Sequence, residues 1–293
     1  MTNIYRLKLF TRKEEDDLIY RKHCIDNKIM AIGWGYCNCE DGTVDEYVKK
    51  ANDMYNDSSS FKTGLNYILN EIKKGDYVWT QIDGLKYYLG KISEDEVHLD
   101  SIQPGVGLTK KCEWKLIENF DDIPGQVISN FVGRGITLCK MGFNEDLKQY
   151  CDWLYHGKSD SDKPKMKNCF SLFHSDDLED LVGLYLQKEG YYIIPSTNKK
   201  GQKLIEYELI NDEGEKACVQ CKIGNSKVTD EKVKEIQEKF KGFKIYVSTF
   251  AENIITDNSV NFISKEILLD FAKKNKNILS QRIKNYLSFE ICK

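Results

Sequence analysis

The chain has little proline and no long apolar run, and these two shortages narrow what it can be. With 4 prolines and 20 glycines in 293 residues, long flexible tracts are not expected. No hydrophobic stretch approaches the roughly 20 residues that a membrane-spanning helix needs, so we expect no membrane segment. The first residues lack the charged start and apolar core of a secretory signal. We therefore expect a folded cytoplasmic protein.

The chain also lacks a large excess of charge of either sign, since its net charge is only −3. A global basic signature for nucleic-acid binding is therefore absent, although the C-terminal half is slightly basic and leaves room for local phosphate contacts. Ten cysteines are scattered along the chain without an export signal, which predicts reduced thiols rather than a disulfide framework. No GxxxxGK[ST] loop occurs, so a phosphate-binding NTPase motor is excluded.

The N-terminal half shows many short strands and a few helices. Two-residue alternation predicts strands, whereas apolar residues at spacings of three and four predict helices. An Asp83-Gly84 pair between two of the strands is a strong hairpin signal. The predicted strands cover residues 3–10, 29–35, 75–82, 87–92, 96–102 and 113–117, and the predicted helices cover 43–55 and 61–74, after a helical stretch that ends near residue 27. This pattern indicates a small, partly open β-barrel with helical crossovers.

Three short motifs in this half resemble the EVE and PUA-like fold. They are Ala31-Ile32-Gly33-Trp34, Lys74-Gly75-Asp76-Tyr77-Val78 and Tyr88-Leu89-Gly90-Lys91-Ile92. The resemblance covers residues 1–155 and implies a reader domain that holds a modified or flipped base. Such a base is read by stacking on aromatic faces and by hydrogen bonds to its edge.

The aromatic residues predicted to bind that base are Trp34, Trp79 and Tyr87, which lie at strand ends or beside glycines. A second interpretation has equal weight for Trp34 and Trp79, because large aromatic side chains dominate the cores of small barrels. Residues 156–169 follow as a predicted linker, since they are polar and contain Gly, Ser and Pro. Lysines in this segment either contact phosphate or are simply solvated.

The sequence of the C-terminal half predicts the order helix, three strands, helix, strand. The first helix starts at Ser175, with Ser and Asp as capping residues, and Gly190 ends it. Its apolar residues fall on one face. The next strand ends before Pro195. The predicted strands cover 191–194, 205–210, 217–222, 244–250 and 261–264, with a turn at 211–214, and the second helix covers 229–240.

The hairpin formed by 205–210 and 217–222 carries the candidate chemistry. Side chains alternate along a strand, so Glu206 and Glu208 share one face of their strand, and Gln220 and Lys222 likewise share a face of theirs. A carboxylate facing a lysine across a hairpin can hold a divalent metal and a water nucleophile. Taken separately, these residues would be ordinary exposed strand faces. Their coincidence on one hairpin, after a helix that carries Glu179, favours a catalytic interpretation.

The order of elements and the Gln-x-Lys motif resemble the Mrr-like branch of the PD-(D/E)xK restriction endonucleases over roughly residues 170–265, and the predicted nuclease domain covers residues 170–293. The resemblance implies an αβββαβ nuclease fold with catalytic residues Glu179, Glu206, Gln220 and Lys222. Metal ligation would fall to Glu206, Gln220 and the Cys221 carbonyl, with Mg²⁺ or Mn²⁺ bound by hard oxygen atoms. Lys222 would orient the attacking water, and Glu179 would act behind the metal ligands.

This sequence departs from the family pattern at one metal ligand. The family more often has Asp where Glu206 stands, and Glu208 on the same face is a rival ligand. We favour Glu206 because its spacing to Gln220 fits the branch better.

The sequence as a whole predicts a two-domain protein of mixed α/β and α+β class that cuts DNA with Mg²⁺ as a homodimer. Its biological role would be type IV-like restriction or another antiviral defence, with modified bases as the recognised feature. One alternative is a nuclease fold that has lost activity and only binds nucleic acid. Another is an effector nuclease that a small nucleotide activates through the N-terminal domain.

Overall fold

The chain folds into two compact units in the computed structural model. The structure describes residues 2–8, 14–32, 42–55, 58–100, 106–132, 137–142, 144–166, 168–198, 204–223, 228–250 and 259–289. The first unit comprises residues 1–123 and 127–164, and the second comprises 124–126 and 165–293. Each unit is described by itself. None of the described helices is long and apolar enough to cross a bilayer.

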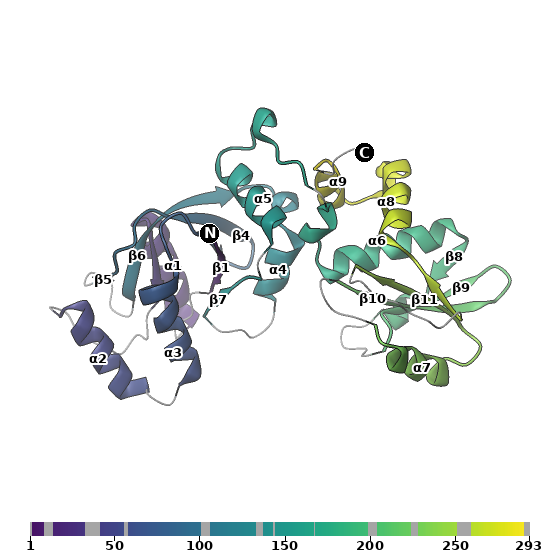
Figure 1. The fold of residues 1–293 in the computed structure, drawn as a ribbon, viewed down its shortest axis with the longest axis horizontal. Helices are drawn as coiled ribbons and strands as arrows, with labels where there is room; N and C mark the ends of the chain where they lie inside the picture. The colour runs from purple at the N-terminus through teal and green to yellow at the C-terminus, as the bar shows by residue number, and fades with distance from the viewer. Residues whose placement is uncertain are drawn as a thin grey trace. The chain divides into compact units, whose positions relative to one another are not determined.

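The first unit is built on one curled, mixed sheet (Figure 1). Its strands are β1 (Ile4–Leu7), β2 (Ile29–Ile32), β3 (Tyr77–Ile82), β4 (Lys86–Ile92), β5 (His98–Asp100), β6 (Gly107–Ile117) and β7 (Leu138–Lys140). They follow the order β2-β6-β4-β3-β1-β7, with β5 beside β6. Asp83 and Gly84 both have positive φ, at 58° and 71°, as the predicted β3–β4 hairpin requires. The result is a half-barrel, and the predicted PUA-like barrel is not confirmed.

Helices cover both faces of this sheet. The helices are α1 (Glu14–Asp26), α2 (Val44–Tyr55), α3 (Ser59–Asn66), a π-helical turn (Tyr67–Glu71), α4 (Gly125–Phe131), which begins in the second unit, and α5 (Glu145–Tyr155). Val78 lies in a core with Phe61 of α3. On the opposite face, the Trp79 indole N–H donates to Cys151 Sγ of α5 at 3.4 Å. Alternation along β3 therefore sends successive side chains to two separate layers.

Strand β6 is longer than the sequence predicted. It begins at Gly107 rather than at residue 113, because its first half pairs with β2 and β5. Lys110 in that half is completely buried. Its Nζ donates to the carbonyl oxygens of Ile72 at 2.8 Å and Asp95 at 2.7 Å. The sequence pattern does not predict this half of the strand, because the lysine interrupts the apolar alternation.

Residues of the predicted linker fold onto the first unit as far as Pro164. Lys158 forms an ion pair with Asp122. The indole N–H of Trp153 donates to the Ser159 carbonyl at 2.9 Å. The first contact ties the segment to the 3-10 turn at Phe120–Asp122, and the second ties it to α5.

The second unit has the predicted order of elements, αβββαβ. The elements are α6 (Ser175–Lys188), β8 (Tyr191–Ile193), β9 (Tyr207–Asn211), β10 (Lys216–Lys222), α7 (Asp230–Lys239), β11 (Lys244–Thr249), β12 (Val260–Phe262), α8 (Lys265–Lys274) and α9 (Gln281–Leu287). The sheet runs β12-β11-β10-β9-β8, antiparallel from β8 to β10 and parallel from β10 to β12. Helices α6 and α7 lie on opposite faces of it (Figure 1).

Close packing fixes α6 against the sheet. A Cβ atom added at Gly183 would lie 2.9 Å from Ile193 Cδ1 and 3.2 Å from Tyr207 Oη, so a larger residue there would force the end of the Ile193 side chain to shift. The N-cap of α6 is His174, whose side chain accepts from the Asp176 amide, and not the predicted Ser or Asp. On the other face, Ile236 of α7 packs in a second apolar core.

Candidate active site

The hairpin of β9 and β10 places Glu206 across from Gln220. Tyr207 pairs with Val219, and Glu208 pairs with Cys218. One residue before β9, the Glu206 amide donates to the Val219 carbonyl at 2.7 Å, which extends the ladder. The register set by the turn therefore brings the predicted carboxylate and the predicted amide to the same end of the hairpin.

Gln220 is buried at the centre of this arrangement, with 1% of its surface exposed. Its Nε2 donates to Glu206 Oε1 and, at 3.1 Å, to the Cys221 carbonyl oxygen. Its Oε1 is buried and has no hydrogen-bond partner among the residues that the structure describes. Leaving a buried acceptor without a hydrogen bond costs about 1–3 kcal/mol of folding free energy. The Gln220 side-chain oxygen can therefore accept one further bond.

Lys222 completes the cluster from the end of β10. Its Nζ lies 3.5 Å from Glu206 Oε1, with 40% of the lysine side chain and 17% of the glutamate side chain exposed. Glu208 lies instead opposite Cys218. Among the described residues, the ion-pair partner of Lys222 is Glu206, which is the arrangement that our preference for Glu206 requires.

Glu179 joins the cluster from α6. Its backbone carbonyl accepts a hydrogen bond from Tyr207 Oη at 2.9 Å. Burial, followed by the Glu206 carboxylate, raises the pKa of the Glu179 carboxyl to about 7, although Lys222 opposes the rise. Direct contacts join Glu206, Gln220 and Lys222, and the Glu179 carboxyl lies close enough to feel the charges of Glu206 and Lys222.

The cluster fits a hard divalent cation. Glu206 Oε1 and the Cys221 carbonyl oxygen converge on one donor, the Gln220 amide nitrogen. Rotating that amide would replace the donor by the unpartnered Oε1, so that three oxygen atoms would face one point. Oxygen donors of this kind suit Mg²⁺. Within the described ranges, no group of three or more His, Cys, Asp and Glu side chains is placed to hold a metal, so a site here depends on the amide and carbonyl oxygens.

The predicted base-binding residues are in a different setting. Trp79 is fully buried, and Tyr87 is 3% exposed. The Tyr87 ring packs edge-on against Phe131, with ring centroids 5.5 Å apart. Trp34 lies outside the described residues. Trp79 is therefore placed as the core alternative expected, and base binding by these residues stays a prediction.

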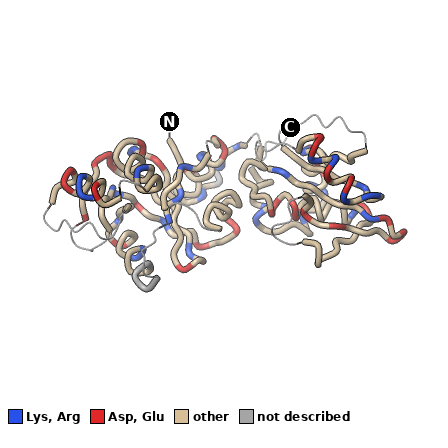
Figure 2. Tube along the Cα trace, turned by 90° about the horizontal axis from the view of Figure 1, so that it is seen from below, with Lys and Arg blue, Asp and Glu red and all other residues tan. Residues whose placement is uncertain are grey.

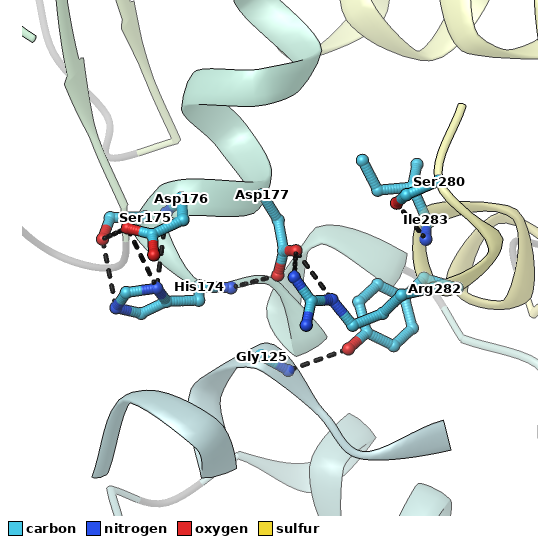
Figure 3. A network of polar contacts seen from close by, with 9 residues as sticks. Gly125, His174, Ser175, Asp176, Asp177, Ser280, Arg282 and Ile283 are labelled. Atoms are coloured by element: carbon cyan, nitrogen blue, oxygen red, sulfur yellow. Dashed lines mark hydrogen bonds and ion pairs between the residues drawn. The ribbon is translucent and has the colours of Figure 1, made fainter. Parts of the chain in front are cut away.

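Sequence reasoning missed the residues that hold α6 in place. The sequence predicts Asp177 only as a capping acid, yet Arg282 donates to it across 105 residues of sequence (Figure 3). Tyr207 is predicted only as part of the strand at 205–210. Local patterns contain no signal for either contact, because both join elements that are distant in the chain.

Charges of both signs are interspersed over the described chain in the view of Figure 2. Neither unit shows a broad single-sign stretch in that view. Contact with a phosphate backbone would therefore depend on local lysine and arginine side chains.

Comparison with protein-family models gave two matches. Residues 172–268 match the restriction endonuclease family. Residues 8–120 match a domain of unknown function (DUF8426), so the EVE/PUA-like resemblance of the first unit is not confirmed. Comparisons with curated proteins and with solved structures gave no match.

The restriction endonuclease match spans the helix with Glu179 and the whole Glu206–Lys222 hairpin. It supports a restriction-endonuclease-like nuclease, with DNA as the implied substrate. The observed αβββαβ order fits that fold.

Proposed function

We propose that the chain is an endonuclease that hydrolyses phosphodiester bonds in DNA with Mg²⁺, and that its site is the cluster of Glu179, Glu206, Gln220 and Lys222. The observation that carries the proposal is the convergence of Glu206, Lys222 and the unsatisfied Gln220 amide within the region matched to restriction endonucleases.

Each residue has a role that follows from its contacts. Glu206 and the Cys221 carbonyl would hold the metal, and Gln220 Oε1 would complete the set of oxygen ligands. A bound Mg²⁺ would neutralise phosphate charge and make water a better nucleophile. Lys222 would orient the attacking water and stabilise the negative charge that develops on the phosphate. Glu179, with a pKa near neutrality, is suited to exchange a proton with that water.

Two extensions rest on the sequence resemblance. Two copies of the chain would act together to cut both strands, and the first unit would select DNA that carries a modified or flipped base. The corresponding role would be restriction of foreign DNA.

The proposal is tested by cleavage of plasmid DNA, with and without modified bases, in Mg²⁺ and in EDTA. Wild type should cut only with the metal. Lys222→Ala and Glu206→Ala should lose cleavage, because each removes a group from the cluster. Glu208→Ala is the matched control on the same hairpin and should cut as wild type. Equal cleavage by Lys222→Ala, Glu206→Ala and wild type would overturn the site assignment.

One observation favours a second candidate, a nucleic-acid-binding module without catalysis. Glu206 already has two partners in the protein, the Gln220 amide and Lys222. A carboxylate satisfied in this way binds a metal less readily. This candidate predicts DNA binding that EDTA does not change and no turnover with any divalent ion.

A further inference from the structure

A buried ion pair sits at the N-terminal turn of α6. Asp177 is 1% exposed. Its Oδ1 accepts from Arg282 Nε at 2.8 Å and from Arg282 Nη2 at 2.5 Å (Figure 3). Its Oδ2 accepts from the His174 amide at 2.8 Å, which closes the capping box of the helix. One carboxylate therefore both starts α6 and ties it to α9.

A third segment, at Gly125, packs against this ion pair. The Gly125 amide donates to Tyr286 Oη of α9 at 2.8 Å. A Cβ atom on Gly125 would lie 2.1 Å from Asp177 Oδ2 and 2.6 Å from the His174 nitrogen. Only glycine allows this approach, and residues 124–126 belong to the second unit. Residues 124–126, which are distant in sequence, therefore cover the Asp177 carboxylate.

The ion pair and the nuclease cluster act on opposite sides of one helix. Asp177 and Glu179 are two residues apart, and two residues turn an α-helix by about 200°. Fixing the Asp177 side chain therefore fixes the direction of Glu179. Tyr207 Oη holds the Glu179 carbonyl from the sheet, so α6 is restrained against both rotation and lifting.

We propose that the Asp177–Arg282 ion pair is a positioning element of the nuclease site, which sets the rotation of α6 so that Glu179 faces Glu206 and Lys222. The inference rests on the proposed nuclease function. Arg282 and Gly125 both lie outside the region matched to restriction endonucleases, residues 172–268. In this chain the nuclease domain therefore extends to α9 and to residues 124–126.

The test uses the full chain, since a fragment that starts at residue 165 would lack Gly125. Its variants are Arg282→Ala, Arg282→Lys and Asp177→Asn. Ile236→Ala is the control for lost stability, because Ile236 is buried on α7 in a separate core. Two quantities are measured well below the melting temperature of every variant. They are the affinity for Mn²⁺ without DNA, from free Mn²⁺ by electron paramagnetic resonance, and the cleavage rate against Mg²⁺ concentration.

Arg282→Ala and Asp177→Asn should weaken Mn²⁺ binding about 10- to 100-fold, as loss of a group behind metal ligands does. Cleavage should fall by up to about 10²-fold, as expected for a displaced catalytic group. Arg282→Lys keeps the charge but loses the two-pronged contact, so its values should be intermediate. Ile236→Ala should melt earlier and keep wild-type affinity and rate.

The inference is overturned if Arg282→Ala only melts earlier, or if Ile236→Ala loses affinity and rate to the same extent. Wild type that binds Mn²⁺ but never cuts DNA would contradict the proposed function. In that case, weaker Mn²⁺ binding by Arg282→Ala would still support the positioning role. Wild type that neither binds Mn²⁺ nor cuts would contradict both.

Discussion

Replacing Glu179 by Gln should stabilise the metal-free protein more at pH 8 than at pH 5. Burial and the Glu206 carboxylate raise the pKa of Glu179 from 4.5 to about 7 in the folded state. A raised folded-state pKa favours the protonated form, so its contribution to stability is present below pH 4.5 and is lost as the pH rises through about 7. Wild type should lose stability across that window, and Glu179→Gln should not.

The size of the effect follows from the size of the pKa shift. In a fully shielded site, a rise from 4.5 to about 7 corresponds to ~3 kcal/mol. Glu179 is only partly buried, and solvent screening reduces the expected difference to on the order of 1–2 kcal/mol. The assay is urea denaturation of the full chain in EDTA at both pH values, with hydrogen exchange of the β10 amides reporting on the second unit. Glu208→Gln is the matched control. A Glu179→Gln gain that is the same at pH 5 and pH 8 would contradict a raised pKa of the Glu179 carboxyl.

Three further substitutions test other contacts. Gln220→Glu replaces a hydrogen-bond donor by a second carboxylate beside Glu206. The metal-free protein should therefore lose about 2–3 kcal/mol of unfolding free energy and regain it with Mg²⁺ in thermal melts. No gain with Mg²⁺ would count against the metal site. Tyr207→Phe removes the bond to the Glu179 carbonyl and should cost about 1 kcal/mol in urea denaturation and lower the cleavage rate; an unchanged rate would show that this bond does not position Glu179. Lys110→Met leaves the buried Ile72 carbonyl oxygen and the partly exposed Asp95 carbonyl oxygen without their lysine donor, and should cost roughly 1–3 kcal/mol in the first unit, measured by urea denaturation; wild-type stability would show that the amine is dispensable.

The order of elements in the second unit was accessible from sequence because its signals are local. Apolar spacing marks α6, and Gly190, with φ of 91°, ends it. The first unit was harder, because its strands pair over long distances. Strand β6 was underestimated, since Lys110 reads as a surface residue until two carbonyl oxygens are found around it.

In the candidate site too, contacts within one hairpin were predictable from sequence, whereas contacts between distant elements were not. Glu206 and Gln220 were linked from sequence, because a short turn fixes the register of their hairpin. The Asp177–Arg282 ion pair was not, because 105 residues separate its partners. Trp79 could not be assigned either, since an aromatic residue beside a turn suits a core and a binding pocket equally well, and only packing distinguishes the two.

The most direct test of the account is a crystal structure of the full chain soaked in Mn²⁺, with the metal located by anomalous scattering. We expect a single ion bound by Glu206, the Cys221 carbonyl and Gln220 Oε1, at distances of about 2.0–2.3 Å. The Gln220 amide should be rotated relative to the metal-free arrangement, so that its nitrogen no longer faces Glu206. An ion at Glu208, or an empty Glu206–Gln220 cluster at saturating Mn²⁺, would contradict it.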